Sequence, residues 1–245
     1  MLLDVRGLSA LYPGSNEGLA LHGVTFSIGE GEKVALIGAN GAGKSTLLLS
    51  LSGILEASEG KIEVDGDALQ KKNLPLIRRK LGLLFQNPDD QLFMPTVYED
   101  VIFGPLNYAG SAAGNGSIHP SETESVDRTA CGVLEKLEIL HLKDRMSHKL
   151  SGGEKRLAAL AVVLVMEPRL ILMDEPSAFL DPRARRRLVA VLKTLPQAYL
   201  IATHDLALAL ELCDRCLILS GGHLRADGPA RDIINDAALL DECGL

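Results

Sequence analysis

The chain has 245 residues, of which 47% are hydrophobic and 23% are charged, and its formal net charge at pH 7 is −7. This length and composition are typical of one large globular domain or two small ones with a substantial core. The net negative charge excludes a global basic field for nucleic acid or anionic lipid, and the longest apolar run, residues 157–166, is about half of the ~20 residues that a membrane-spanning helix needs.

Short apolar runs bounded by turn residues dominate the first third of the chain. We predict strands at residues 2–12, 19–28, 33–37, 61–64 and 81–85. The run at 61–64 leads into Asp65-Gly66, a pair typical of a tight turn. The run at 33–37 is followed by a glycine-rich turn and then by a predicted helix over 46–53.

The middle of the chain favours helices, and the last third returns to alternating strands and helices. Helices are predicted at 97–109 and 121–143, with a linker at 109–117 that is rich in Gly, Ser and Ala. A long helical run after Ser151 extends to about Glu167. The predicted elements that follow are strands at 169–173, 198–203, 215–220 and 222–226, a helix at 205–213 and a helical tail at 229–243. Such alternation predicts a mostly parallel sheet whose ligands bind at the carboxyl ends of the strands.

Residues 38–46, Gly-Ala-Asn-Gly-Ala-Gly-Lys-Ser-Thr, match the phosphate-binding pattern G-x-x-x-x-G-K-[ST] between a strand and a helix. Glycine allows the backbone to approach a phosphate closely, so that N–H groups converge on the anion. Lys44 is predicted to reach the β- and γ-phosphates, and Ser45 to give a hydroxyl to Mg²⁺. The motif predicts nucleotide binding by Asn40, Gly41, Ala42, Gly43, Lys44, Ser45 and Thr46.

Four residues come just after predicted strands: Gly38, Gln86, Asp174 and His204. Because the carboxyl ends of parallel strands share one rim of a sheet, we expect the chemistry at that rim.

The order of the motifs resembles that of an ATP-binding-cassette (ABC) ATPase over essentially the whole chain. Leu150-Ser-Gly-Gly-Glu154 matches the signature of that family, and 170–175, Leu-Ile-Leu-Met-Asp-Glu, matches its acidic strand end. The resemblance implies an α/β fold, a P-loop NTPase with a RecA-like parallel sheet core, an N-terminal antiparallel β subdomain and an inserted helical subdomain. It implies a single cassette over 1–245. The expected divisions are a core over about 1–86 and 151–228, a helical subdomain over about 87–150 and a short helical tail over about 229–245.

The resemblance also implies an ATPase activity that uses ATP and Mg²⁺. Asp174 and Gln86 would join Ser45 around the metal. Glu175 would act as general base on the attacking water, and Gln86 would contact that water. His204 would approach the γ-phosphate. Taken singly, these residues also have plain structural interpretations, such as solvated carboxylates or a histidine at a helix start.

In the family that the chain resembles, a second cassette completes each site. Ser151 and the amides of Gly152 and Gly153 would form a helix start that faces the ATP of the partner. Asp181 matches the loop that crosses between subunits, and Tyr12 the aromatic residue that stacks on adenine. The resemblance therefore implies a second ATPase subunit, either another copy or a paralogue.

Residues 85–93, Phe-Gln-Asn-Pro-Asp-Asp-Gln-Leu-Phe, resemble the extended glutamine loop of energy-coupling-factor transporter ATPases. Residues 99–107 continue that likeness, and the tail at 239–245 resembles the cobalt- and nickel-type members. The resemblance implies a peripheral subunit at the cytoplasmic face of the membrane that powers import of cobalt, nickel or a vitamin. Its partners would be an integral membrane coupling subunit and a substrate-binding membrane subunit, without nucleic acid. A conventional ABC importer with another cargo and a non-transport ABC ATPase stay open as alternatives.

Three further patterns are interpreted as structural. Cys213 and Cys216 form a C-x-x-C without the second pair that a zinc site needs, and we expect buried thiols at a helix-to-strand junction. The arginines within 183–187 have the spacing of a solvated helix face. His141 and His148 are expected at the surface.

Overall fold

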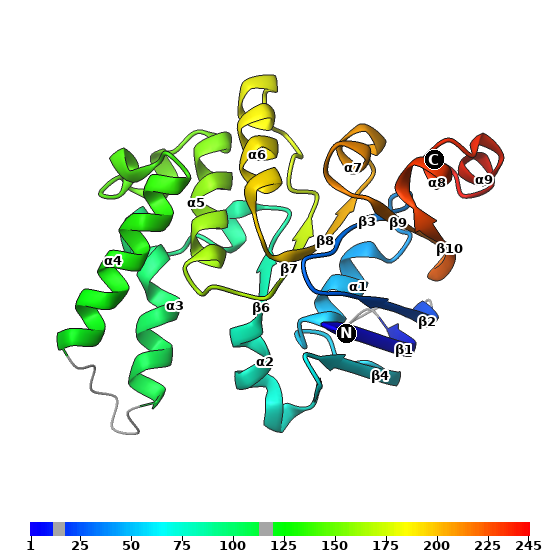
Figure 1. Cartoon of the computed structure of the whole chain (residues 1–245), viewed down its shortest axis with the longest axis horizontal. Helices are drawn as coiled ribbons and strands as arrows, with labels where there is room; N and C mark the ends of the chain where they lie inside the picture. Colours follow the sequence, from blue (N-terminus) through cyan, green and yellow to red (C-terminus); the bar gives the residue numbers. More distant parts are fainter. Residues whose placement is uncertain (12–17, 113–119) are drawn as a thin grey trace. The chain divides into compact units, whose positions relative to one another are not determined.

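The structure is a computed structural model that describes residues 1–11, 18–112 and 120–245, with side chains outside 109–122 (Figure 1). The chain packs as two units. The first consists of Met1–Leu83, Arg169–Pro176 and Leu195–Leu245, and the second of Leu84–Pro168 and Ser177–Thr194. The predicted core and helical subdomain stay a prediction, because units of packing need not coincide with subdomains that move.

A six-stranded sheet in the order β10-β9-β3-β8-β7-β6 forms the centre of the first unit. Its strands are β3 (Lys33–Ile37), β6 (Leu81–Leu84), β7 (Leu170–Asp174), β8 (Ala198–Thr203), β9 (Arg215–Ser220) and β10 (His223–Pro229). β3 pairs in parallel with β8 and β9, β7 pairs in parallel with β8, and β9 and β10 form an antiparallel hairpin. The central strands are buried almost without interruption, as expected for parallel strands covered on both faces. The predicted mostly parallel sheet is confirmed.

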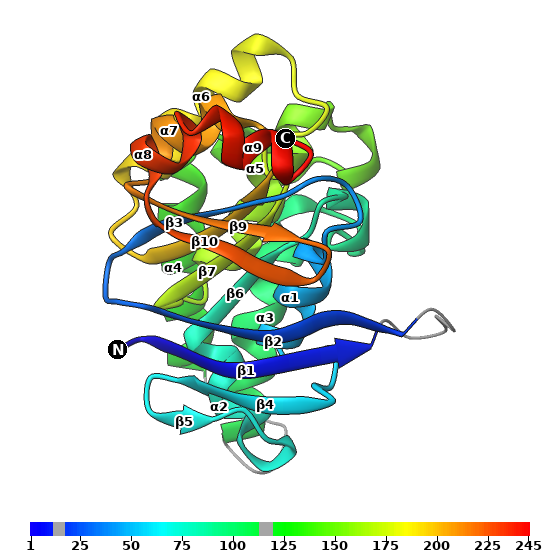
Figure 2. The same ribbon diagram turned by 90° about the vertical axis from the view of Figure 1, so that its right-hand side faces the viewer.

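A second, antiparallel sheet in the order β2-β1-β4-β5 completes the strands of the first unit (Figure 2). It contains β1 (Leu3–Leu11), β2 (Leu19–Ile28), β4 (Glu59–Val64) and β5 (Asp67–Ala68). The turn between β4 and β5 has left-handed backbone at Asp65 (φ 52°) and Gly66 (φ 79°), as its sequence predicts. Helix α1 (Lys44–Leu51) packs against strands of both sheets, and their apolar side chains form one hydrophobic core.

Short helices complete the first unit, and longer ones build the second. The short ones are α2 (Leu74–Lys80), α7 (Leu206–Leu212), α8 (Ala230–Ile234) and α9 (Ala237–Glu242). The second unit contains α3 (Val97–Ala112), α4 (Pro120–Lys136), α5 (Gly152–Leu164) and α6 (Pro182–Thr194). α3 packs against α4 and α5, and α5 also contacts α4 and α6 (Figure 1). Single 3₁₀ turns lie at Lys71–Asn73, Pro88–Asp90, Leu140–Leu142 and Ser147–Lys149.

Several predicted helical boundaries were wrong, among them those of α1 (Lys44–Leu51, predicted over 46–53) and the end of α5 (Leu164, predicted near 167). The helix predicted to residue 143 ends at Lys136, because Glu138 adopts φ 56° and the N–H groups of Glu138 and Ile139 close the helix end on Glu135 and Leu134. The tail is two helices, because Asp236 caps a new helix by accepting the N–H of Leu239. Residues 109–112 of the linker predicted over 109–117 belong to α3, and residues 113–117 lie outside the described residues.

The structural interpretations of the remaining patterns are largely confirmed. Cys213 and Cys216 are buried between α7 and β9, and burial raises the pKa of each thiol to about 12. His141 and His148 are exposed. Arg187 departs from a solvated face, since it donates to the carbonyl oxygens of Leu137 and Glu138.

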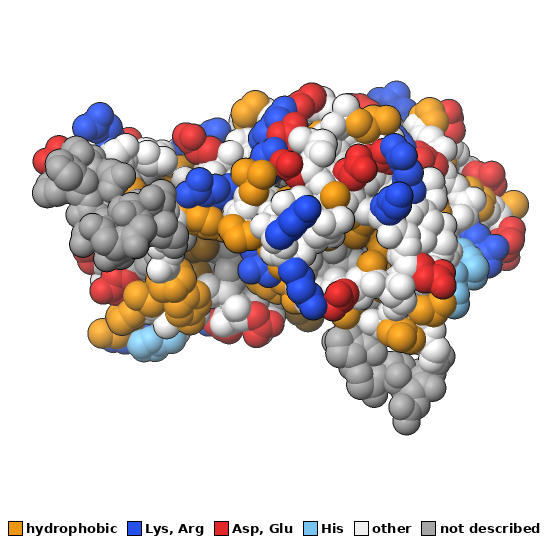
Figure 3. Space-filling view, turned by 90° about the horizontal axis from the view of Figure 1, so that it is seen from below, with side chains coloured by type: hydrophobic (Ala, Val, Ile, Leu, Met, Phe, Trp, Pro, Cys, Tyr) orange, Lys and Arg blue, Asp and Glu red, His pale blue; other side chains and the backbone are white. Residues whose placement is uncertain are grey.

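The surface charges and the apolarity of the helices can be examined over the described part of the chain. On the face in Figure 3, Lys and Arg side chains are interspersed with Asp, Glu and hydrophobic side chains. Among residues 1–11, 18–112 and 120–245, no helix combines the length and apolarity needed to cross a bilayer.

Candidate functional site

The phosphate-binding loop joins the end of β3 to the start of α1. Gly41 (φ 80°) and Gly43 (φ 103°) have left-handed backbone that other residues rarely adopt. A Cβ atom on Gly38 would lie 2.4 Å from the carbonyl oxygen of Leu219, and one on Gly43 would lie 2.8 Å from that of Ala20. The loop therefore needs glycine for two reasons, its backbone conformation and its close packing on neighbouring strands.

The Lys44 side chain lies over the loop that precedes it. Its Nζ donates to the carbonyl oxygens of Gly38 (2.6 Å) and Ala39 (3.1 Å), and the residue is 7% exposed. Burial lowers the pKa of Lys44, although Glu175 and Asp174 attract its charge and oppose that shift. A phosphate on the loop would offer this ammonium group charged acceptors in place of two carbonyls.

Glu175 follows the last residue of β7 with left-handed backbone (φ 44°) and a buried side chain. One carboxylate oxygen accepts a hydrogen bond from Thr203 Oγ1 (3.1 Å). The other accepts from the His204 N–H (3.1 Å) and lies 2.7 Å from His204 Nδ1. The backbone N–H of Glu175 donates to the carbonyl oxygen of Ala202 (2.8 Å). The end of β8 thus holds this carboxylate at the rim where β3 and β7 also end.

Oxygen donors suited to Mg²⁺ lie at the same rim. The Ser45 hydroxyl belongs to an exposed residue in the first turn of α1, and Asp174 is partly exposed at the end of β7. Mg²⁺ prefers carboxylate, hydroxyl and phosphate oxygens and usually retains several waters. This donor set fits Mg²⁺ bound together with a nucleotide phosphate. Gln86, the third predicted ligand, belongs to the second unit.

Ser151 begins α5 through a capping box in the second unit. Its Oγ accepts the N–H of Glu154, whose carboxylate accepts from the N–H and Oγ of Ser151 (2.8 Å each). These bonds lower the pKa of Glu154. A Cβ on Gly153 would lie 2.7 Å from that of Ala184 in α6, whereas one on Gly152 would meet nothing within 4 Å. Gly153 therefore serves helix packing, and Gly152 leaves the helix start open.

The remaining predicted site residues lie in varied surroundings. Asp181 starts α6, where its carboxylate accepts the N–H groups of Ala184 (3.0 Å) and Arg183 (2.8 Å), which lower its pKa. Asn40 is exposed, and Ala42 and Thr46 are buried. Tyr12 lies outside the described residues.

A comparison with protein families shows which family has this arrangement of motifs. Residues 21–178, well over half of the chain, match the family model described as ABC transporter. The chain belongs to the ABC transporter family. The matched range includes the phosphate loop, the signature at 150–154 and the acidic pair at 174–175.

Related ABC proteins align over nearly the whole chain. A putative ABC transporter ATP-binding protein of Gloeobacter violaceus, gll0289, is 49% identical and covers 99% of this chain and 95% of its own length. The energy-coupling factor transporter ATP-binding protein EcfA of Carboxydothermus hydrogenoformans is 38% identical, with 100% of this chain and 87% of the relative covered.

Two solved structures share the fold. CbiO1 from Clostridium perfringens, described as part of the ABC transporter complex cbiONQ, has a TM-score of 0.80 and 34% identity, with 98% of this chain and 93% of that chain covered. The cassette MJ0796, solved as a dimer in a post-hydrolysis state with ADP and Pi, has a TM-score of 0.78 and 27% identity over 94% of this chain and 99% of that chain. The present chain is thus an ATP-hydrolysing ABC transporter subunit that resembles EcfA and CbiO.

Arg156 is a residue of this ABC cassette that the sequence analysis did not identify. It is 2% exposed, and its Nη1 and Nη2 donate to the carbonyl oxygens of Phe85 and Gln86 (2.6 Å each). Its signal in the sequence is a charged residue directly before the apolar run 157–166, on the face of α5 that becomes buried.

Two more contacts fasten the extended glutamine loop, residues 85–93, to α5. Gln91 Nε2 donates to the carbonyl oxygen of Ala159 (3.0 Å), and Lys155 Nζ lies 2.6 Å from the Asp89 carboxylate. Together with Arg156, they hold the loop along the first two turns of the signature helix.

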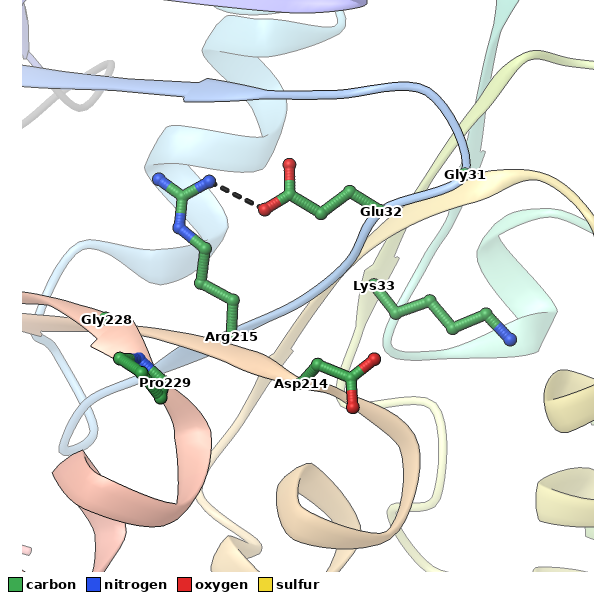
Figure 4. Close-up of a pocket in the computed structure, with 7 residues that line it drawn as sticks. All are labelled: Gly31, Glu32, Lys33, Asp214, Arg215, Gly228 and Pro229. Carbon is green, nitrogen blue, oxygen red and sulfur yellow. Dashed lines mark hydrogen bonds and ion pairs between the residues drawn. The ribbon is translucent and has the colours of Figure 1, made fainter.

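Figure 4 shows a pocket of about 480 Å³ at the amino ends of β3 and β9, the rim opposite the phosphate loop. Arg215 donates to both oxygens of the Asp227 carboxylate (2.6 and 2.7 Å) and to Glu32 (2.8 Å). The Asp227 carboxylate raises the pKa of Arg215. These ion pairs join β9 and β10 to the turn before β3, and the pocket lies outside the nucleotide site.

Proposed function

We propose that the chain is the ATPase subunit of an energy-coupling-factor importer, in which two cassettes close on ATP to drive uptake. The observation that carries the catalytic part is the buried Glu175 carboxylate, held by Thr203 and His204 at the rim of the phosphate loop. The 38% identity to EcfA, the likeness to CbiO1 and the residues of the extended glutamine loop support the importer type.

Each side chain then has a defined task. Glu175 accepts a proton from the attacking water, and His204 holds the Glu175 carboxylate and contacts the γ-phosphate. Lys44 binds the β- and γ-phosphates together with the backbone N–H groups of the loop. Mg²⁺ held by Ser45, Asp174 and Gln86 would neutralise phosphate charge. We also assign adenine stacking to Tyr12.

The signature residues act on the nucleotide of a second cassette. Ser151 and the open helix start at Gly152 present a hydroxyl and N–H groups, which suit an anion. Asp181 belongs to the loop that we expect to cross between the cassettes. The dimer of MJ0796 with ADP and Pi is a precedent for such pairing.

The extended glutamine loop is proposed to receive an integral membrane coupling subunit. Phe93 is 64% exposed and packs edge-on against Phe103, with ring centroids 4.9 Å apart. The buried Asp100 carboxylate fixes this end of the loop by accepting the N–H groups of Phe93 and Met94 (2.9 Å each). A rigid apolar surface of this kind suits a coupling helix docked in a groove.

This docking would place the chain as a peripheral subunit on the cytoplasmic face of the membrane. A substrate-binding membrane subunit would select the cargo. Cobalt or nickel is favoured over a vitamin because of the likeness of the tail at 239–245 to the cobalt- and nickel-type members.

Replacing Glu175 by Gln tests the catalytic proposal. The amide keeps the size of the side chain but does not accept the proton of water, so we expect hydrolysis to fall by about 10²–10⁴-fold while ATP binding is retained. Gel filtration with ATP should then show a stable dimer. Glu167→Gln is the matched control, since Glu167 is an exposed glutamate with left-handed backbone (φ 48°) away from the motifs. Normal turnover in the Glu175 variant would contradict the assignment of the base.

Purification of the complex from native membranes tests the importer type. We expect a tagged chain to carry a small integral coupling subunit and a separate substrate-binding membrane subunit, whose bound cargo identifies the transporter. Recovery with a periplasmic-type binding protein would favour a conventional importer. Recovery without membrane subunits would favour a non-transport ABC ATPase.

A further inference from the structure

Two histidines, His22 and His223, stack on one another although they lie far apart in the sequence. Their ring centroids are 4.7 Å apart and their planes are 12° from parallel. His22 belongs to β2 and His223 begins β10, the strands at neighbouring edges of the two sheets (Figure 2). Both residues are exposed and belong to the first unit. The fold therefore brings two imidazole rings together where solutes can reach them.

The backbone fixes the two histidines on either side of a tight turn. The N–H of His22 donates to the carbonyl oxygen of Gly222 (2.9 Å), the residue directly before His223. Gly222 is buried and has left-handed backbone (φ 76°), and a Cβ atom there would lie 2.8 Å from Cδ2 of His22. Because this position has no side chain, the His22 ring can lie against the turn and contact the ring of His223.

The same turn supports the phosphate-binding loop. The N–H of Gly222 donates to the carbonyl oxygen of Ala42 (3.1 Å). Gly43 approaches the carbonyl oxygen of Ala20, two residues before His22, so closely that a Cβ atom on Gly43 would lie 2.8 Å from it. A ligand that joins the two histidines would therefore hold together the strands against which the loop packs.

The surroundings of the two rings suit a metal cation. Within residues 1–11, 18–112 and 120–245, neither imidazole has a hydrogen bond or an ion pair to another side chain, and β2 contains no charged residue. Imidazole is a good ligand for Ni²⁺, Cu²⁺ and Zn²⁺, whereas Mg²⁺ prefers oxygen. Two nitrogens that bind one cation at about 2.0–2.1 Å lie at most about 4.2 Å apart. Exposed rings with centroids 4.7 Å apart need only rotate modestly to bring a nitrogen of each to one ion.

We propose that His22 and His223 form a binding site for a late first-row divalent cation such as Ni²⁺, with water completing the coordination shell. The bound cation links β2 to β10 and stabilises the two strands that support the phosphate loop. The site differs from the Mg²⁺ site proposed at Ser45 and Asp174, because its donors are imidazole nitrogens rather than oxygens. The inference goes beyond the proposed function and does not depend on the importer type, since its evidence is the histidine pair.

The test measures Ni²⁺ binding to the untagged chain without nucleotide, so that no phosphate is present to bind the metal. Isothermal titration calorimetry should show one Ni²⁺ per chain. At a Ni²⁺ concentration about 100 times the Kd, the melting temperature should rise by about 5 °C or more. His22→Gln and His223→Gln each remove one of the two protein ligands, so binding should weaken by about tenfold or more in each. His148→Gln is the matched control, because it removes an exposed histidine from the second unit and should leave binding unchanged.

A second measurement locates the ion directly. Paramagnetic Ni²⁺ should broaden the NMR signals of the His22 and Gly222 amides at lower concentrations than those around His148. Because the replaced side chains are exposed, the glutamine variants should melt near the temperature of the unaltered chain when no metal is present.

Three results would overturn the site: no Ni²⁺ binding, equal Ni²⁺ affinity in the two glutamine variants and the unaltered chain, or an equal rise in melting temperature with Mg²⁺. None of these measurements involves ATP hydrolysis, so their failure leaves the proposed function intact. Conversely, normal turnover in Glu175→Gln would contradict the catalytic proposal and leave the histidine site intact.

Discussion

Five described residues other than glycine have left-handed backbone: Asp65, Glu138, Glu167, Glu175 and Phe179. The first three lie in a hairpin turn or just beyond a helix end, where this conformation closes local hydrogen bonds. The other two lie between Asp174, the last residue of β7, and Asp181, which caps α6. Such residues cost on the order of 1–3 kcal/mol each. The backbone of this segment therefore lowers the stability of the fold at the place where we propose the chemistry.

The orientation of Glu175 depends on Thr203, which leads to a prediction for Thr203→Val. Thr203 is fully buried, and its hydroxyl donates to Glu175 and accepts the N–H of Asp205 (3.0 Å). Valine keeps the shape but removes both bonds, so we expect a loss of about 1–3 kcal/mol in stability. We expect kcat for ATP to fall by about tenfold or more with little change in KM, since the base is misaligned while the phosphate contacts remain.

Urea unfolding and steady-state ATPase assays measure the two effects. Thr194→Val is the control, because Thr194 is exposed and its hydroxyl bonds only within α6, to the carbonyl oxygen of Val191. If kcat were unchanged in Thr203→Val, another contact would have to orient the carboxylate.

At the level of elements, sequence patterns located those strands and helices whose signals are local. The strand predicted at 33–37 and the helix start at Ser151 agree with β3 and α5, because apolar runs and a capping box act within a few residues. The end of α4 was missed because Glu138 closes it in place of the usual glycine. Arg156 was missed because its partners, carbonyl groups 70 and 71 residues earlier, are brought to it only by tertiary packing.

The link between the signature helix and the glutamine loop can be tested with Arg156→Met. Methionine retains much of the volume but removes the donors of two partly buried bonds to the carbonyl groups of Phe85 and Gln86, so we expect a loss of about 1–3 kcal/mol. Without these bonds to α5, the glutamine loop should couple the membrane subunits to the ATPase site less effectively. The stimulation of ATPase activity by the membrane subunits should therefore fall more than the basal rate of the isolated chain. Thermal or urea unfolding and ATPase assays in the two states measure this.

Lys155→Met provides the neighbouring control on the same helix. Its ion pair with Asp89 is partly solvent-exposed and should contribute less than about 1 kcal/mol. Equal loss of basal and stimulated activity in Arg156→Met would reduce its role to folding.

At the scale of the whole molecule, the order of motifs along the chain predicted the fold class and the family, because the phosphate loop, signature and acidic strand end are each defined by local sequence. The pairing of cassettes is inferred instead from where the two nucleotide-binding motifs lie. The phosphate loop belongs to the first unit and the signature to the second, and each chain has one of each. A symmetric pair that matches loop to signature would create two composite sites.

Mixing two inactive variants tests whether the sites are composite. Lys44→Met should disable the phosphate loop, and Ser151→Arg should place a bulky charge at the signature helix start, so each variant alone should lose ATPase activity. In a mixed dimer, the intact loop of the Ser151→Arg chain meets the intact signature of the Lys44→Met chain, while the other site carries both defects. Random pairing yields about half mixed dimers with one intact site of two, so equimolar mixing should restore up to about a quarter of wild-type activity. Sites built within one chain would give no recovery, because every chain in the mixture carries a defect, and that result would contradict the shared site on which dimer closure depends.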